Sequence, residues 1–296
     1  MSPLILFPDF AVIALGFALR RFWLPASAWS TIEKLVYFVL FPCLLFYSIV
    51  HSEIDLGKAG VFGAGSAFVV LAATLLGAVA KPLSHMNRVD FASGLQTAYR
   101  FNSYIALALA SRIDGAQGVA HIAILMAIAV PLCNVIAVGS MSKGKYHQIP
   151  LEILKNPLVI STLLGIGAKL LHLPVPAPVM ETLSRLGQAA VALGLMAVGA
   201  GLLFSGLRGH WLISVWWLTL KLLVSPILAL GYAHWAHLTI EETRMLVIFA
   251  ALPSASSAYI LAARMGGNAP LVACLISLST VGAAFSLPLV FLLPIH

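Results

Sequence analysis

Two polar residues stand close together inside one of the long apolar stretches of this sequence. The segment YRFNSYIALALASR (99–112) contains a guanidinium, Arg100, and an amide, Asn102. An arginine stays charged at physiological pH, and its planar fork of N–H donors matches the two oxygens of a carboxylate. The pair therefore predicts an anion site. Structural alternatives stay open: Arg100 pairs with a carbonyl or carboxylate or snorkels to the interface, and Asn102 joins helices.

A second apolar stretch is interrupted by a proline and three serines. In ALPSASSAY (251–259), Pro253 lacks an amide proton, so a helix kinks or unwinds at this point. Ser254, Ser256 and Ser257 follow, and their hydroxyls can bind the backbone groups that the break leaves free. Irregular backbone at membrane depth is tolerated only where protein or a water-filled cavity surrounds it. This pattern favours a functional break over an ordinary proline kink.

A further charge, Lys221, stands at the centre of the apolar segment WWLTLKLLVSP (216–226). A charge at that depth is costly unless it is paired or hydrated. Two interpretations stay open. Lys221 supplies a second positive charge to the anion site, or it bonds to carbonyls that Pro226 leaves free.

The composition assigns the chain to the membrane class. Of its 296 residues, 61% are hydrophobic and only 9% are charged, whereas soluble domains carry about 25% charged residues. The basic residues, which give a formal charge of +7, are scattered singly at the ends of apolar runs. Scattering of this kind is typical of topology signals, so we expect no nucleic-acid partner. The three cysteines show no metal-ligand spacing, and we expect neither a metal nor a cofactor.

Apolar runs of about 20 residues are long enough to cross the hydrocarbon core as helices. We therefore expect an all-α membrane protein with ten transmembrane helices. Their expected ranges are 3–20, 30–50, 58–80, 90–111, 117–139, 156–172, 178–205, 211–233, 243–263 and 270–293.

The two halves of the sequence resemble one another. LGFALRRFWLP (15–25) aligns with LGIGAKLLHLP (164–174) at an offset of 149, with Leu, Gly, Leu and Pro in register. The segments 88–115 and 240–267 align independently at an offset of 152. Two alignments in the same order, at nearly the same offset, indicate an internal repeat.

The repeat predicts three parts: a first five-helix repeat over 1–140, a cytoplasmic link over 141–155 and a second five-helix repeat over 156–296. Five is odd, so the second copy enters the membrane from the opposite side. Such inverted repeats are typical of secondary transporters. Basic loop residues number nine on one side and four on the other, which places both termini outside the cytoplasm.

The repeat also relates the two polar segments. Phe101 and Asn102 align with Pro253 and Ser254, so helices 4 and 9 are expected to be broken and to cross at their breaks. The N-terminal ends of two half-helices would then meet near the midplane. These ends carry partial positive charge and free N–H groups, which suit an anion.

Several blocks together resemble the auxin efflux carrier family, including its bacterial members. They are RFNSYIALALA, PLCNV, KNPLVISTLLGIGAKLL, LGQAAVALGLMAVGAGL and LPSASSAYILAARMGG. The resemblance covers nearly the whole chain and rests on the order and spacing of these blocks.

The resemblance implies a scaffold of spans 1, 2, 6 and 7, and a transport unit of spans 3–5 and 8–10 that moves as an elevator. It implies that Asn102 keeps its place in the family pattern, as does Asn134. It also implies small carboxylate substrates such as malonate, malate or auxin-like acids. The sequence departs from the family after Asn102, where neither proline nor glycine follows. We therefore expect a shallower break in span four than in span nine.

The combined prediction is a secondary transporter of small organic anions in a bacterial inner membrane. Its partners would be the anion and membrane lipid, with a homodimer left open. The substrate, the direction of transport and the coupling ion are not readable. The candidate substrate-binding residues are Arg100, Asn102, Ser103, Tyr104, Asn134, Lys221, Pro253, Ser254, Ser256 and Ser257.

Three other functions stay open. A sodium-coupled symporter of the bile-acid type would share the crossed-helix fold, but the broken spans carry no acid midway. An intramembrane enzyme with a serine nucleophile would need a base nearby, and no HExxH or GxSxG motif is present. Because these motifs are missing, we expect no enzyme activity. A membrane receptor is the third alternative.

Overall fold

The computed structural model describes residues 6–52, 59–141, 156–204 and 210–290, and the predicted link 142–155 lies outside them. Within these ranges the regular structure is helical and no strand occurs. The helices are α1 (Phe7–Phe22), α2 (Ala26–Leu35), α3 (Phe41–His51), α4 (Ala59–Val79), α5 (Arg88–Tyr99), α6 (Ser103–Met141), α8 (Pro157–Leu170), α9 (Ala177–Ala200), α10 (Trp211–Thr219), α11 (Ser225–Trp235), α12 (Ile240–Ala251), α13 (Ser256–Arg264) and α14 (Ala269–Val290). Short turns of other helix types are η2 (Val36–Leu40), η3 (Lys81–Leu83) and η5 (Leu220–Val224).

The helices follow the apolar stretches of the sequence, and each of the ten expected ranges largely coincides with helix. Among the described residues, six helical runs are long and apolar enough to cross a membrane. The number is seven if α12 and α13, which meet at a bend of 45°, form one broken span. Length and composition thus establish six or seven spanning helices, and the ten crossings stay a prediction. α1 and α8 are shorter, with 16 and 14 residues.

The long helix α6 is divided by a kink. Asp114 (φ −144°) and Gly115 (φ 54°) lie outside helical geometry. Gly115 adopts this positive φ at no steric cost because it lacks a Cβ atom. The kink falls between the expected helices 90–111 and 117–139. One expected helix therefore ends and the next begins at the kink, as the hydropathy indicates.

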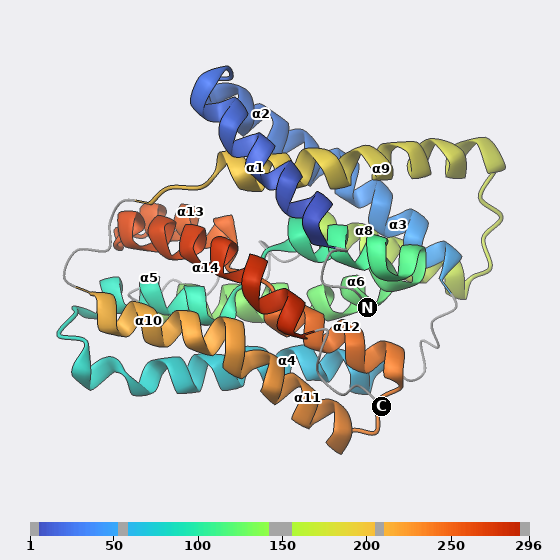
Figure 1. Ribbon diagram of the computed structural model, residues 1–296. Coiled ribbons are helices and arrows are strands. Elements are labelled where there is room, and N and C mark those ends of the chain that lie inside the picture. The colour runs from blue at the N-terminus through green and yellow to red at the C-terminus, as the bar shows by residue number, and fades with distance from the viewer. Residues whose placement is uncertain (1–5, 53–58, 142–155, 205–209, 291–296) are drawn as a thin grey trace.

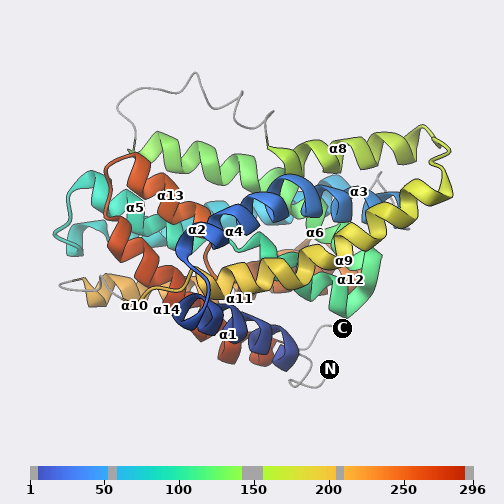
Figure 2. The ribbon, with the colours of Figure 1, turned by 90° about the horizontal axis from the view of Figure 1, so that it is seen from above.

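The helices pack as two groups (Figures 1 and 2). The first group consists of α1, α2, α3, α8 and α9, which lie along the upper side in Figure 1. The second group consists of α4, α5 and α10 to α14. α6 lies between them, because it contacts α4, α5 and α12 as well as α3, α8 and α9. The first group contains the spans that the family resemblance assigns to a scaffold, whereas α6, which the resemblance assigns to the transport unit, contacts both groups.

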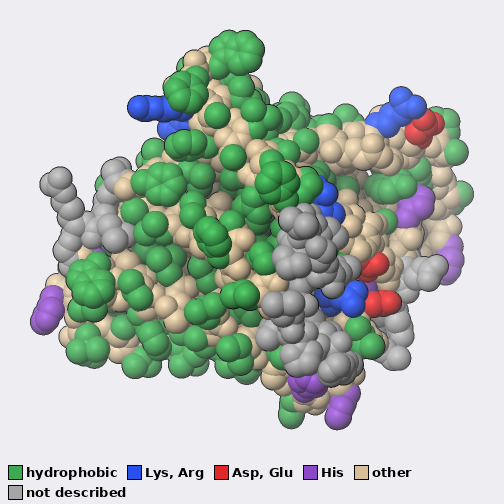
Figure 3. All heavy atoms as spheres, in the orientation of Figure 1, with side chains coloured by type: hydrophobic (Ala, Val, Ile, Leu, Met, Phe, Trp, Pro, Cys, Tyr) green, Lys and Arg blue, Asp and Glu red, His purple; other side chains and the backbone are tan. Residues whose placement is uncertain are grey.

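The surface is suited to lipid. Large apolar side chains such as Phe22, Leu75, Leu212 and Phe285 are exposed on helices of both groups. Figure 3 shows apolar side chains over most of one face, with charged side chains gathered toward its upper and right-hand edges. An apolar belt with charges at its margins is what a membrane-spanning protein requires.

An ion pair joins α1 to the first half of α6. Arg112 Nε donates to Asp9 Oδ2 at 2.8 Å, and Arg112 Nη2 donates to Asp9 Oδ1 at 2.6 Å. The Asp9 side chain is 3% exposed and the Arg112 side chain 35%. The two hydrogen bonds fix both the distance between the two side chains and their orientation. The ion pair therefore holds α6 against the first group.

The backbones of α1 and α9 touch at two glycines. A Cβ atom added to Gly199 would lie 1.8 Å from the Ile13 carbonyl oxygen, and one added to Gly16 would lie 2.0 Å from the Met196 carbonyl oxygen. Small residues permit this close approach in membrane helices. Arg20 Nη1 also donates to the Ala200 carbonyl at the same contact.

We expect Gly199→Ala to lower the free energy of unfolding by about 1–3 kcal/mol, because the new methyl group overpacks the α1–α9 contact. Thermal unfolding of the purified protein in detergent measures the loss. Gly167→Ala on α8 is the matched control, since its Cβ would meet nothing within 4 Å; we expect it to stabilise the helix by up to about 1 kcal/mol. Equal losses in the two variants would contradict the contact.

Candidate functional site

Both expected breaks are present in the helices. α5 ends at Tyr99 and α6 begins at Ser103, so residues 100–102 lie outside helix. α12 ends at Ala251 and α13 begins at Ser256, so residues 252–255 lie outside helix. The first break is therefore the shorter by one residue. In Figure 1, α5 and α13 lie on the left and α12 on the right, and the breaks meet near the middle of the molecule.

Hydrogen bonds tie the two breaks together. The Asn102 backbone N–H donates to the Pro253 carbonyl at 2.8 Å. In the opposite direction, the Ser254 hydroxyl donates to the Thr97 carbonyl. The Ser254 backbone N–H donates to Ser279 Oγ on α14 at 3.1 Å. Pro253 and Ser254 thus hold the crossing together, and Ser254 is fully buried.

Arg100 lies at this crossing and is 6% exposed. Its Nη2 donates to Asn134 Oδ1 at 2.9 Å, and its Nη1 donates to Ser257 Oγ at 3.2 Å. Its Nε is buried without a hydrogen-bond partner. Both partners are neutral, and no carboxylate among the described residues forms an ion pair with Arg100. The structure thus brings Arg100, Asn134 and Ser257 together around a buried positive charge.

Asn102 has a structural role in addition to its place at the site. Its Oδ1 accepts from the Tyr104 backbone N–H at 3.0 Å and from the Ile105 N–H at 3.2 Å, so it caps α6. Among the described residues its Nδ2 group makes no hydrogen bond. α13 differs, because its N-cap residue Ala255 provides no side-chain cap. The Ala258 N–H donates to the Ala255 carbonyl at 3.0 Å, so the N–H groups of Ser256 and Ser257 are the uncapped ones at the start of α13, and Ser257 is exposed there.

The other candidate residues lie at different distances from Arg100. Tyr104 stacks on Phe41 of α3 with ring centroids 5.1 Å apart, at the contact with the first helix group. Ser103 and Ser256 are partly exposed, and their side chains make no hydrogen bond within the described ranges. Lys221 is 2% exposed, and its Nζ donates to the Ala250 carbonyl at 3.1 Å. That bond goes to α12, not to a carbonyl beside Pro226.

Several residues of the crossing were not among the sequence candidates. Thr97 and Ser279 bind Ser254, as described above, and the buried Tyr99 hydroxyl interacts with the Arg100 guanidinium. The polar residues of ISLST (276–280) in an apolar stretch were an available signal for Ser279. No sequence signal could have identified the Ala250 carbonyl as the partner of Lys221, because every residue has a backbone carbonyl.

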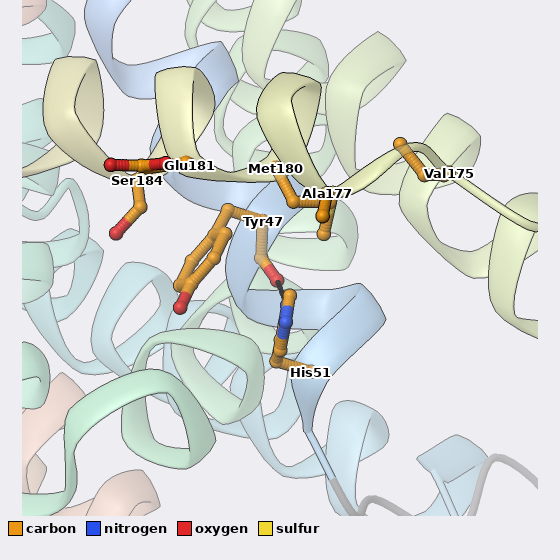
Figure 4. A pocket seen from close by; sticks show the side chains of 7 residues that line it. All are labelled: Tyr47, His51, Val175, Ala177, Met180, Glu181 and Ser184. Atoms are coloured by element: carbon orange, nitrogen blue, oxygen red, sulfur yellow. Dashed lines mark hydrogen bonds between the residues drawn. The ribbon is translucent and has the colours of Figure 1, made fainter.

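A pocket of about 490 Å³ lies elsewhere, at the ends of α3 and α9. Figure 4 shows Tyr47 and His51 from α3 facing Met180, Glu181 and Ser184 from α9. His51 Nδ1 lies 3.1 Å from the Tyr47 carbonyl oxygen in the same helix. Because Glu181 is already paired with Arg185, this pocket offers no charge comparable to the buried Arg100.

The membrane transport protein family, which is the auxin efflux carrier family, has a sequence model that matches residues 5–291. The chain belongs to this family. The match covers nearly the whole chain, so the resemblance read from the sequence blocks is confirmed. Members of the family are transporters rather than enzymes, and the chain is an integral membrane protein. A search of curated proteins finds no match.

The cap at the first break can be tested separately from transport. We expect Asn102→Ala to lower the free energy of unfolding by about 1 kcal/mol, because α6 loses the acceptor for two N–H groups. Asn102→Ser should stay closer to the parent, since serine is also a strong N-cap residue. Thermal unfolding in detergent compares the three proteins. A serine variant as unstable as the alanine variant would contradict the capping role.

Proposed function

We propose that the chain is a secondary transporter of small organic anions in the inner membrane of a bacterium. The supporting observation is the state of Arg100, a buried guanidinium whose partners are two neutral oxygens and whose Nε has none. Burial of a charge is costly unless an opposite charge compensates it. A carboxylate substrate would supply that charge.

The anion would lie between Arg100 and the start of α13. There the uncapped N–H groups add the positive end of a helix dipole to the guanidinium charge. The Ser257 hydroxyl and the Asn102 Nδ2 group would donate further hydrogen bonds. Asn134 would hold the guanidinium plane in place, because it binds Nη2 and leaves Nε free. Mono- or dicarboxylates such as malonate, malate or auxin-like acids fit this chemistry.

The movement would carry the crossed breaks past the first helix group as an elevator. In this proposal ten helices in two inverted repeats cross the membrane, and α1, α2, α3, α8 and α9 form the scaffold. The Asp9–Arg112 ion pair joins the scaffold to α6 in this conformation. It would open when α6 moves, so it favours the conformation seen here.

Further parts of the proposal follow from the sequence. Both termini would lie outside the cytoplasm, the chain would have no catalytic activity and need no cofactor, and two copies would form a homodimer. A sodium-coupled symporter is the weaker alternative, since no carboxylate among the described residues binds at the crossing. Sodium dependence of uptake would distinguish the two transporters.

We expect Arg100→Gln to weaken binding of malonate or malate by about 1.5–3 kcal/mol, roughly 10- to 100-fold, the scale of a hydrogen bond to a charged group. Arg100→Lys should recover only part of the affinity, because it keeps the charge and loses the fork. The measurement is uptake of a panel of labelled carboxylates into proteoliposomes, with the protein content of each preparation determined.

Arg185→Gln is the matched control. Arg185 lies on α9, its side chain is 77% exposed, and its pair with Glu181 is a surface pair of small energy. Its uptake should equal that of the parent. Normal anion uptake by Arg100→Gln would make Arg100 a structural residue and move the site elsewhere.

A further inference from the structure

Lys221 is held at the end of a half-helix by a single interaction. It lies in the π-helical turn η5 between α10 and α11, and its Nζ donates to the Ala250 carbonyl of α12 at 3.1 Å. Among the described residues this is the one hydrogen bond of Nζ. The side chain is 2% exposed, so water does not replace the missing partners at the surface.

The Ala250 carbonyl is free because of the break in the helix. In a continuous helix it would accept from the N–H of Ser254, four residues on. Here that N–H donates to Ser279 Oγ at 3.1 Å. The Lys221 ammonium therefore caps the C-terminal, negative end of α12. In transporters with broken helices, such half-helix ends and free carbonyls are the places that bind a coupling cation.

The helices around Lys221 provide no counter-charge. η5 packs against α4, α5, α10, α11, α12 and α14. Neither α4 nor α10 carries a titratable or charged residue, and α14 carries only Cys274. From α6, Cys133 is in electrostatic contact with Lys221. The remaining titratable and charged groups on these helices are Arg88, Asp90, Tyr99, Tyr232, His234, Glu241, Glu242 and Arg244.

The acids among these groups lie far along their helices. Asp90 is in the first turn of α5 and is bound to Asn87 at 2.6 Å. Glu241 and Glu242 are in the first turn of α12, where Glu242 accepts from the Thr239 N–H at 2.9 Å. At 1.5 Å per residue, Glu242 lies about 12 Å along the helix from Ala250. No described acid thus forms an ion pair with Lys221.

Lys221 and Arg100 both lie at the crossing of the two broken helices. Ala250, which binds Lys221, lies three residues before Pro253, and the Pro253 carbonyl binds the N–H of Asn102, two residues from Arg100. The amine therefore lies close to the crossing that forms the anion site. The two cations differ chemically, because an arginine stays protonated whereas a buried lysine can exchange its proton. A bound anion favours the charged amine, and a proton on the amine favours a bound anion.

We propose that Lys221 is the proton-binding site of this transporter and takes the place of a coupling sodium ion. The inference rests on the proposed function. The amine takes one proton from the aqueous side where the anion binds, crosses as an ammonium with the anion, and releases that proton on the other side. The first repeat has no lysine at the matching position, where residues 69–72 are VVLA.

The experiment uses purified protein in liposomes, with labelled malonate as the probe. The membrane potential is held at zero with potassium and valinomycin, and the outside is made acidic. We expect the parent to accumulate malonate about tenfold for each unit of the pH gradient, the equilibrium ratio for one coupled proton. Replacing sodium by choline should change nothing, and protein-free liposomes give the background.

Lys221→Met should exchange malonate across the membrane with a lower affinity than the parent, because the site loses one positive charge, and it should no longer concentrate malonate in response to the pH gradient. Lys221→Arg, whose charge is permanent, should likewise not concentrate malonate in response to the gradient. Lys169→Met is the matched control, because Lys169 also binds a carbonyl at a helix end, that of Ser52, but lies in the first helix group. It should concentrate malonate as the parent does.

Gradient-driven accumulation by Lys221→Met would overturn the inference, as would a parent that transports malonate without response to the pH gradient. A parent that transports no carboxylate would overturn the proposed function instead. In that case the proton site is tested without substrate, by NMR of protein with ¹³C-labelled lysines. The signal that is missing from the spectrum of Lys221→Met belongs to Lys221. A change of charge state between about pH 6 and pH 9 supports the proton site, and a constant charge state overturns it.

Discussion

The structure depends on the need to satisfy backbone groups where two helices break inside an apolar protein. A free N–H or carbonyl costs several kcal/mol in hydrocarbon, so each break needs partners that water cannot supply. The breaks provide them for one another: the Asn102 N–H binds the Pro253 carbonyl, and the Ser254 hydroxyl binds the Thr97 carbonyl. Because each break satisfies groups of the other, neither can close into a continuous helix alone. The same contact brings the start of α13 and the residue that follows α5, Arg100, to one place.

The sequence predicts the part of this arrangement that depends on composition and on side chains with special backbone effects. Hydropathy locates the helices, and Pro253 with its serines locates the second break. The internal repeat then predicts the first break, because Phe101 and Asn102 align with Pro253 and Ser254. Neither a proline nor a glycine marks this first break. What the sequence does not predict is the choice of partner. Asn102 was expected as a ligand, yet its Oδ1 caps α6. The partner of Lys221 is the Ala250 carbonyl, which is free because the helix breaks and the Ser254 N–H binds Ser279 of α14 instead.

The position of α6 explains how a local event at the crossing can involve the whole molecule. Its first half begins at the break, beside Arg100, and carries Arg112, which holds Asp9 of α1. Its second half carries Asn134, which orients the Arg100 guanidinium, and Cys133, which lies near both cations. Between the halves, the positive φ of Gly115 permits the kink that lets one helix serve both ends. A shift of α6 relative to the first helix group would therefore change the anion site and the Asp9–Arg112 pair together.

The two buried cations also determine what charge the proposed site can move. With both side chains protonated, a dicarboxylate neutralises the site, and it crosses the membrane together with a proton as one net negative charge. With Lys221 neutral, Arg100 alone matches a monocarboxylate. Each net charge that crosses is worth about 2.3 kcal/mol per 100 mV of membrane potential, which is comparable to the hydrogen-bond energy at Arg100. An inside-negative potential favours export of an anion. A proton that crosses with the anion lowers the exported negative charge by one, and so weakens this driving force. The protonation of a single lysine would thus set how strongly the membrane potential drives the substrate outward, while Arg100 keeps the selection for anions unchanged.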